Sequence, residues 1–221
     1  MKTRIDLHVH SALSACAEII MSPRQILSRA RQCGIDMLAV TDHNASKHAL
    51  LMVRIGPEYG VTVLPGMEVT TREEVHILAL FSRCDALQDF QRLVDSALPA
   101  EANSADVFGH QIVYDADDEV TDLDMQLRQV GTTMSIDRTT MEIHERGGRA
   151  VPAHVYRKRY SLTSQLGLID ADSDFDAVEV SRPVWQRGGY QLGMQIEGFT
   201  AITGSDAHFL EDIGRGGIQL E

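Results

Sequence analysis

Residues 4–18, "RIDLHVHSALSACAE", place two histidines one residue apart at the end of a short apolar strand. Side chains alternate along a strand, so Asp6, His8 and His10 face one side and the residues between them face the other. Two imidazoles about 7 Å apart on one face can reach a single metal ion. Taken alone, the pattern fits a polar rim of a barrel equally well.

The rest of the chain alternates short apolar strands with amphipathic helices. The helix expected over residues 22–34 has Ser22 as its N-cap, Pro23 in its first turn and Gly34 as its stop. Strands separated by helices indicate an α/β fold with parallel strands. About seven strands in a chain of 221 residues favour a distorted seven-stranded β/α (TIM-like) barrel.

Polar residues recur where the predicted strands end. Residues 204–208, "GSDAH", repeat the opening pattern with a carboxylate and an imidazole two positions apart. The C-terminal ends of parallel barrel strands converge on one mouth, so we expect these side chains to meet there. The set at the strand ends is His43, Glu68, His154, Asp206 and His208.

His76 begins a strand instead of ending one. The polar turn after Thr71 suggests that residues 61–71 and 75–81 form a hairpin, which would bring His76 beside Glu68. Five or six histidines and two or three carboxylates are too many for one tetrahedral ion, so at least two metals are expected. Imidazole and carboxylate together suit Zn, Mn or Fe, which can activate water and neutralise a phosphoryl or acyl oxygen.

Several motifs together resemble the polymerase and histidinol phosphatase (PHP) family of metal-dependent phosphoesterases. They are "DLHVHS" at 6–11, "TDHN" at 41–44, "GMEVTT" at 66–71, "VHILALF" at 75–81, "PAHV" at 152–155 and "TGSDAH" at 203–208. The resemblance implies the seven-stranded barrel and two or three divalent metal ions at its mouth. It also implies three ligand groups: His8, His10, Glu68 and Asp206; Glu68, His76 and His154; and His43 with His208.

The chain departs from the family pattern at Ala15, where the family commonly has an aspartate that helps to hold the third ion. Alanine cannot bind a metal. We expect Glu18 to replace the aspartate, with Cys16 as the alternative, because a thiolate binds Zn and Fe well. The competing interpretation makes Glu18 a surface residue ahead of the helix that begins at Ser22.

Other polar residues suggest supporting roles. Asp42 and Glu179 are expected to accept the N–H of a ligand histidine. Arg157 or Arg159, shortly after His154, is expected to clamp a phosphate, and Arg182 is a weaker candidate. A solvated basic turn is the alternative for the first two.

Composition and net charge limit the partners and the cellular location that we expect. The net charge is −12 and no basic run occurs, so we expect a small phosphorylated substrate and not long nucleic acid. No apolar stretch is long enough for a membrane span, no secretion signal is evident, and the three cysteines form no CxxC pair, which fits a reducing cytoplasm. We expect a single domain over residues 1–221 with an acidic irregular insertion at about 99–131.

These observations predict a metal-dependent hydrolase of phosphoester bonds. A metal-bound hydroxide at a di- or trinuclear site would cleave a small phosphate ester or a nucleotide. Arg157 would orient the substrate, and Asp206 or His208 would move a proton. Two alternatives remain: an exonuclease-type hydrolase on short nucleic acids, and a metal-bearing module without catalysis, which the alanine at position 15 keeps open.

Overall fold

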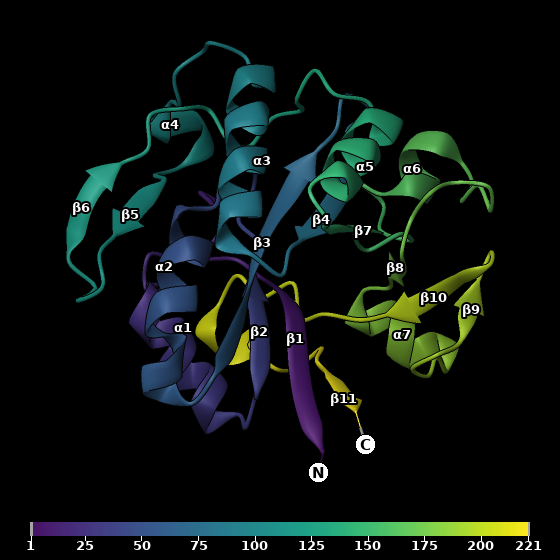
Figure 1. The fold of residues 1–221 in the computed structure, drawn as a ribbon, viewed down its shortest axis with the longest axis horizontal. Coiled ribbons are helices and arrows are strands. Elements are labelled where there is room, and N and C mark those ends of the chain that lie inside the picture. Colours follow the sequence, from purple (N-terminus) through teal and green to yellow (C-terminus); the bar gives the residue numbers. More distant parts are fainter. Residues whose placement is uncertain (1, 221) are drawn as a thin grey trace.

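The main sheet of the protein is a curled half-barrel of six strands (Figure 1). The computed structural model describes residues 2–220. The strand order is β11 (Ile218–Leu220), β1 (Thr3–Val9), β2 (Met37–Val40), β3 (Thr62–Thr70), β4 (His76–Leu80) and β7 (Arg149–Pro152). β1, β2 and β3 run parallel, while β11, β4 and β7 pair antiparallel with their neighbours. The predicted α/β class is confirmed, but a closed seven-stranded barrel is not.

The later strands form a separate small sheet. Its order is β8 (Val178–Glu179), β10 (Phe199–Ile202) and β9 (Gln195–Ile196). Two contacts tie it to the main sheet. The Val155 N–H donates to the Glu179 carbonyl at 2.8 Å, and a parallel bridge joins Val9 to Ala207. The segment that follows β10 therefore lies beside the end of β1.

The predicted hairpin is confirmed. β3 and β4 pair antiparallel, with Thr70 opposite His76 and Glu68 opposite Leu78. In β3 the apolar Met67 and Val69 belong to the main core. Because side chains alternate along a strand, Glu68 points to the other side of the sheet. The pairing thus brings the first residue of β4 to the polar end of β3.

Helices cover the outside of the half-barrel, and α1 illustrates how the sequence fixes their ends. Ser22 is its N-cap, Pro23 its first residue, and Gly34 beyond its end has a φ of 66°, as predicted. None of the helices within residues 2–220 is both long and apolar enough to cross a membrane. The helices are α1 (Pro23–Gln32), α2 (Lys47–Ile55), α3 (Cys84–Ala97), α4 (Ala105–Phe108), α5 (Ile136–Glu145), α6 (Leu162–Leu166) and α7 (Arg182–Gly188), with 3-10 turns at Gly56–Tyr59 and Leu210–Asp212.

The core lies between the sheet and these helices. Leu38, Met67 and Ile77 from the sheet and Phe90 from α3 are fully buried. Each such side chain contributes about 1.5–3 kcal/mol by leaving water. This packing holds the strands rigidly, so the polar residues at their ends have fixed positions.

Residues 99–131, the predicted acidic insertion, contain α4 and a hairpin of β5 (Ile112–Tyr114) and β6 (Val120–Leu123). Figure 1 shows this hairpin at the left edge of the molecule, on the side away from β9 and β10. The Ile112 N–H donates to the Ala12 carbonyl at 2.9 Å, so the hairpin is attached to the loop after β1. The division of the chain into a single domain stays a prediction.

Candidate metal centre

Eight polar side chains from six segments meet at one end of the half-barrel, and we call this group the metal basin. It consists of His8, His10, His43, Glu68, His76, His154, Asp206 and His208. His8 belongs to β1, Glu68 to β3 and His76 to β4. A parallel bridge between His43 and Glu68 lies in the β2–β3 register, three residues beyond the last pair of Val40 with Pro65, so the ends of these strands place their side chains together.

The remaining members follow short strands of the second half of the chain. His154 comes two residues after β7, and Asp206 and His208 flank the residue that bridges to Val9. His154 and Asp206 adopt left-handed backbone conformations, with φ of 34° and 50°. Such conformations cost about 1–3 kcal/mol each and concentrate at functional sites, where surrounding contacts enforce them. The local turn aims both side chains back into the basin.

Glu68 is the centre of the basin. Its carboxylate is 1% exposed. Five imidazoles have a nitrogen 3.1–3.3 Å from one of its oxygens: His8, His10, His43, His76 and His154. The same carboxylate therefore belongs to more than one ligand group, as a bridging ligand would.

Three overlapping groups of side chains have ligand atoms within 4.8 Å of one another. Glu68 belongs to two of these groups, and so do His10 and His43. The groups are His8, His10 and Glu68; His43, Glu68 and His76; and His10, His43 and His208. Each shares two or three members with one of the ligand groups that the resemblance implies, and the assignment of ligands to ions stays a prediction. His154 joins through its 3.3 Å contact with Glu68, and Asp206 lies 3.3 Å from both His8 and His10.

Several buried atoms of the basin have no hydrogen-bond partner among the described residues. They are Nδ1 of His43 and His76, both ring nitrogens of His154, and Oε1 of Glu68. A buried polar atom without a partner costs about 1–3 kcal/mol, and a cation at this position would relieve that cost. Divalent metal ions of the Mn, Fe and Zn type accept such a set of imidazole and carboxylate donors. The residues therefore fit a group of metal ions.

The electrostatics of the basin divide its histidines into two kinds. Burial alone would lower the pKa of His8, but Glu179 and Glu68 outweigh it and raise this pKa well above its usual range. Burial also acts on His10, yet hydrogen bonds with Asp206 and Glu68 raise its pKa to about 9. In contrast, burial lowers the pKa of His208 to about 4. Protons on His8 and His10 thus balance the carboxylates of the metal-free protein.

The carboxylates respond to the same groups. Burial favours the protonated form of Glu68, but His76, His8 and His43 hold its pKa well below the usual range. The pKa of Asp206 is also lowered well below its usual range, against burial, chiefly by His8 and His10. Both carboxylates are ionised at neutral pH and available to cations.

Two further residues hold the histidines in place. Glu179 accepts from His8 Nδ1 at 2.9 Å and from the His154 backbone N–H at 3.0 Å, the role expected of it from the sequence. Asp42 differs from expectation, because its carboxylate contacts no ligand histidine directly. It accepts from Ser14 Oγ at 2.7 Å, and that hydroxyl lies 3.0 Å from His10 Nδ1. Ser14 was missed because a lone serine in a loop gives no signal in the sequence.

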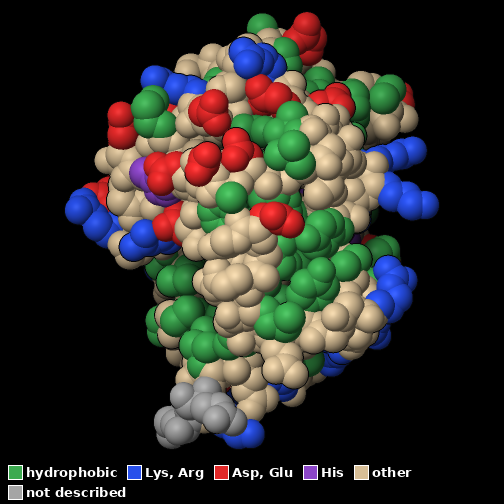
Figure 2. Space-filling view, turned by 90° about the vertical axis from the view of Figure 1, so that its right-hand side faces the viewer, with side chains coloured by type: hydrophobic (Ala, Val, Ile, Leu, Met, Phe, Trp, Pro, Cys, Tyr) green, Lys and Arg blue, Asp and Glu red, His purple; other side chains and the backbone are tan. Residues whose placement is uncertain are grey.

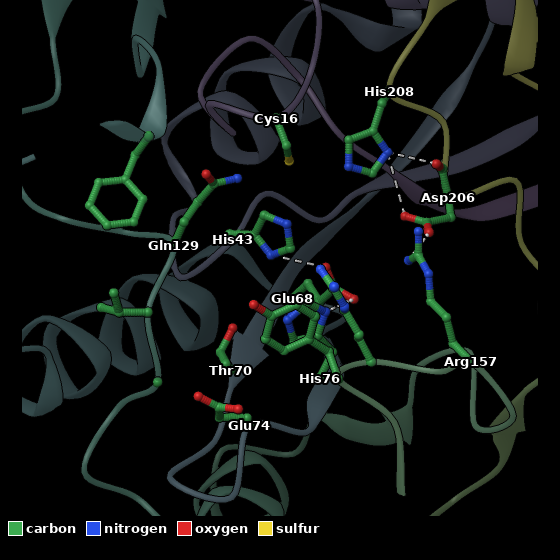
Figure 3. A pocket seen from close by; sticks show the side chains of 15 residues that line it. Cys16, His43, Glu68, Thr70, Glu74, His76, Gln129, Arg157, Asp206 and His208 are labelled. Atoms are coloured by element: carbon green, nitrogen blue, oxygen red, sulfur yellow. Dashed lines mark hydrogen bonds and ion pairs between the residues drawn. The ribbon is translucent and has the colours of Figure 1, made fainter. Parts of the chain in front are cut away.

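The structure leaves Glu18 outside the basin. Its side chain is exposed, and its backbone N–H donates to the His208 carbonyl at 3.0 Å. Cys16 lines the cavity above the basin, and Figure 3 shows its sulfur pointing towards that cavity. Partial burial together with Glu68 and Asp206 raises the pKa of this thiol to about 12, and no ligand group within residues 2–220 includes it. Neither residue occupies the place that Ala15 leaves.

A cavity of about 480 Å³ opens above the basin (Figure 3). Arg157 lies at its edge, half-exposed, and donates to Asp206 Oδ2 at 2.7 Å, while Arg159 also lines it. The ring of Tyr160 stacks on His76 with 4.7 Å between centroids. Phe108 and Gln129 line the far wall. These last two belong to residues 99–131, and no sequence pattern shows that this insertion reaches the site.

Curated relatives match this chain over short regions. A phosphoribosyl 1,2-cyclic phosphate 1,2-diphosphodiesterase of Eggerthella lenta is 35% identical over 80 residues, which are 34% of this chain and 29% of that protein. A 5'-3' exoribonuclease of Haemophilus influenzae is 30% identical over 83 residues, 36% of this chain and 29% of that protein. An uncharacterized protein of Methanocaldococcus jannaschii is 33% identical over 86 residues, 35% of this chain and 50% of that protein. The matched region spans half or less of each relative.

Solved structures share the fold at low sequence identity. Endonuclease Q of Pyrococcus furiosus is 16% identical with a TM-score of 0.64, over 100% of this chain and 52% of that chain. Endonuclease Q in complex with a 27-mer duplex substrate, with an abasic lesion at the active site, gives a TM-score of 0.65 at 16% identity over 100% of this chain and 53% of that chain. A protein of Bifidobacterium adolescentis described as a metal-dependent phosphoesterase gives 0.57 at 18% identity, over 93% of this chain and 87% of that chain.

These neighbours correct one expectation. The acidic net charge led us to expect a small phosphorylated substrate and to set long nucleic acid aside, and this expectation is wrong. Endonuclease Q has this fold and holds a 27-mer duplex substrate, and the Haemophilus influenzae relative is named as an exoribonuclease. Net charge describes the whole surface, whereas cations and local basic residues decide what a site attracts.

The family itself follows from the sequence profile. The profile of the PHP domain matches residues 6–128, which include five of the eight residues of the metal basin: His8, His10, His43, Glu68 and His76. The match covers more than half of the chain, which confirms the resemblance found in the motifs. The chain belongs to the PHP domain family.

Proposed function

We propose that the protein hydrolyses phosphodiester bonds with the help of two or three divalent cations held in the metal basin. The observation that carries the proposal is the buried Glu68 carboxylate with five imidazole nitrogens 3.1–3.3 Å from its oxygens. Divalent cations at such a place supply Lewis acidity that activates water and neutralises phosphoryl oxygens. The donor set fits Mn, Zn or Fe.

Three groups of residues would hold the ions. His8, His10, Glu68 and Asp206 serve one, and Glu68 serves a second with His76 and His154. His10, His43 and His208 serve a third, for which the alanine at position 15 removes one oxygen ligand. The buried nitrogen atoms without hydrogen-bond partners lie in these groups.

The chain's own residues orient the substrate and manage protons. The guanidinium of Arg157 lies over Asp206 and retains donors that can bind a phosphoryl oxygen bidentately. His208 Nδ1 lies 2.8 Å from the Asp206 carbonyl and donates to it, which leaves Nε2 as an acceptor. Because the pKa of His208 is about 4, this ring is neutral at pH 7 and offers a lone pair, not a proton. A role as ligand or base fits His208 better than a role as acid.

A diester fits the surroundings of the basin better than a terminal phosphate does. Two cavities adjoin the basin, and both are lined by Arg157 and Asp206. A substrate can therefore continue in two directions from the reacting phosphorus. The relatives named as a cyclic phosphate diphosphodiesterase and an exoribonuclease also act on phosphate linkages by their names.

The test compares metal-free and reloaded protein. Protein stripped with a chelator should not hydrolyse bis(p-nitrophenyl) phosphate, and addition of Mn²⁺, Zn²⁺ or Fe²⁺ should restore turnover. The monoester p-nitrophenyl phosphate should be the poorer substrate. Elemental analysis should find two to three ions per chain in the active form. A full metal complement without hydrolysis of the diester or of an oligonucleotide would refute the proposal.

A further inference from the structure

A second cavity of about 470 Å³ adjoins the metal basin on the side of α7. His154, Glu179 and Asp206 line it next to the basin, and Arg157 is shared with the first cavity. Two segments form the walls of this cavity. One is the loop after β7, with Tyr156 and Lys158, and the other is α7, with Arg182 and Arg187. We call this cavity the basic groove.

The charge of the basic groove is opposite to that of the protein. Four cations line it in a chain whose net charge is −12: Arg157, Lys158, Arg182 and Arg187. Across residues 2–220 the sole ion pair made by these four joins Arg157 to Asp206. The carboxylate of Glu179 is already engaged by His8 and by the His154 backbone. Lys158, Arg182 and Arg187 thus have no carboxylate partner in that range, and Arg182 donates only to the neutral Gln186 amide oxygen, at 3.2 Å from Nε and from Nη2.

Positive and negative side chains are unevenly distributed over this side of the molecule. Figure 2 shows Lys and Arg side chains along the right-hand edge, and also at the left edge and the top, whereas Asp and Glu lie chiefly over the upper part. Unpaired cations beside a site raise the local concentration of polyanions, even when the protein as a whole is acidic. Phosphate groups are the anions for which arginine pairs are best suited.

The position of the basic groove beside the metal basin indicates which class of phosphate-bearing ligand it would bind. A small diester bound at the basin is held by the ions and Arg157 and does not need Arg182 or Arg187. A polynucleotide carries further phosphates beside the one that reacts. Aromatic rings also stand along the path, with Tyr156 in the basic groove and Phe108 and Tyr160 in the first cavity. Bases of a single strand stack on such rings.

We propose that the basic groove binds the flanking phosphates of a single-stranded nucleic acid whose reacting phosphate lies at the metal basin. This inference rests on the proposed function for the reaction, but binding in the basic groove can be measured without turnover. Arg182 and Arg187 make the phosphate contacts, Lys158 adds charge, and Arg157 joins the two cavities.

The experiment uses the double variant R182A/R187A and follows fluorescence anisotropy of labelled oligothymidylate and oligouridylate in Ca²⁺ without turnover. The affinity of the variant should fall at least about tenfold, since two charge-assisted contacts with phosphate are lost. The slope of log affinity against log salt should become shallower by about 1.4, at about 0.7 for each phosphate that the variant no longer neutralises. The two oligonucleotides show whether the strand is DNA or RNA.

The matched control is R31A/R54A, which removes two exposed arginines from α1 and α2. It should bind both oligonucleotides as the wild type does. With Mn²⁺, R31A/R54A should also hydrolyse bis(p-nitrophenyl) phosphate with the kcat/KM of the wild type. If the oligonucleotide affinity and the salt slope of R182A/R187A equal those of the wild type, the proposal that the basic groove binds flanking phosphates is refuted, even if hydrolysis is normal. Wild-type protein that hydrolyses neither the diester nor an oligonucleotide would refute the proposed function. The affinity measurements would then still test whether the basic groove binds nucleic acid.

Discussion

The Nε2 atoms of His8 and His10 face each other at 3.1 Å, and both lie 3.3 Å from Asp206 Oδ1. Two imidazole lone pairs at this distance repel unless a proton or a cation lies near them. In the metal-free protein the pKa values of both rings are raised, so the rings retain protons at neutral pH. A divalent cation held by the same three side chains would replace those protons, so metal binding and charge balance depend on one small group.

His10→Ala should abolish most turnover, because His10 belongs to two ligand groups and its loss weakens both. We expect kcat to fall more than about 100-fold, since even residues that only support metal ligands contribute 10–100-fold. Elemental analysis should find at least one ion per chain fewer. Asp206→Ala should behave in the same way.

Glu18→Gln is the matched control for these two variants, because its side chain is exposed although the sequence suggested it as a ligand. Its metal content and kcat should equal those of the wild type. Unchanged kinetics in His10→Ala would defeat the assignment of the basin, and lost metal in Glu18→Gln would return Glu18 to the third site.

Glu179→Gln should weaken metal binding without unfolding the protein. The Glu179 carboxylate accepts from His8 Nδ1 at 2.9 Å and so fixes the orientation of the ring. The neutral amide of glutamine removes the negative charge beside the ring and holds it less firmly. We expect metal affinity to fall 10–100-fold, with kcat largely restored at saturating metal. Competition with a chromophoric chelator measures the affinity.

Glu142→Gln serves as the control for Glu179→Gln, because Glu142 is also a buried carboxylate and pairs with Arg146 on α5. It should lower stability without changing metal affinity. Equal affinities in Glu179→Gln and the wild type would contradict the positioning role of Glu179.

The part of the basin that the sequence predicts depends on local geometry. The spacing of His8 and His10 follows from strand alternation, and the hairpin that joins Glu68 to His76 follows from the short polar turn. The predicted end signals of α1 are also local. These features require no knowledge of distant contacts, and the structure reproduces them.

What the sequence could not predict depends on contacts between distant segments. β8 and β9 have two residues each and pair with β10, and such short strands leave no periodic pattern in the sequence. The position of Glu18 is set by the Ala12–Met21 backbone bond, which closes the loop and leaves the carboxylate outside. Phe108 and Gln129 reach the cavity because the insertion folds back over it.

Metal affinity should rise with pH. The pKa of His10 in the metal-free protein is about 9, so a cation must displace its proton at neutral pH. We expect the apparent affinity for Mn²⁺ to increase at least about tenfold from pH 7 to pH 8. Calorimetry in buffers of different ionisation enthalpy should detect released protons.

The metal-free protein should show the opposite dependence on pH. The raised pKa of His10 contributes stability that is complete below pH 6.5 and is lost as the pH rises through about 9. Urea midpoints measured at pH 6.5 and pH 9 check this sign. An Mn²⁺ affinity that does not change between pH 7 and pH 8 would refute a protonated His10.

His48 links the basin to the inserted hairpin and should matter for stability more than for metal binding. Its Nε2 accepts from the Tyr114 N–H at 2.9 Å, so Nδ1 carries the proton and donates to Ser11 Oγ at 2.7 Å. Ser11 donates in turn to Asp42. Burial lowers the pKa of His48, which keeps the ring neutral and this pattern intact at pH 7.

His48→Ala should destabilise the protein by about 1–3 kcal/mol, because Ser11 and the Tyr114 N–H lose a buried partner. Urea unfolding of the metal-loaded protein at pH 7 measures the difference. His110→Ala, at an exposed position of the same insertion, should change stability by less than about 0.5 kcal/mol. Both variants should retain the metal content of the wild type. Equal stability of His48→Ala and His110→Ala would show that the hydrogen-bond chain does not fasten the hairpin, and lost metal in His48→Ala alone would make His48 a positioning residue of the basin.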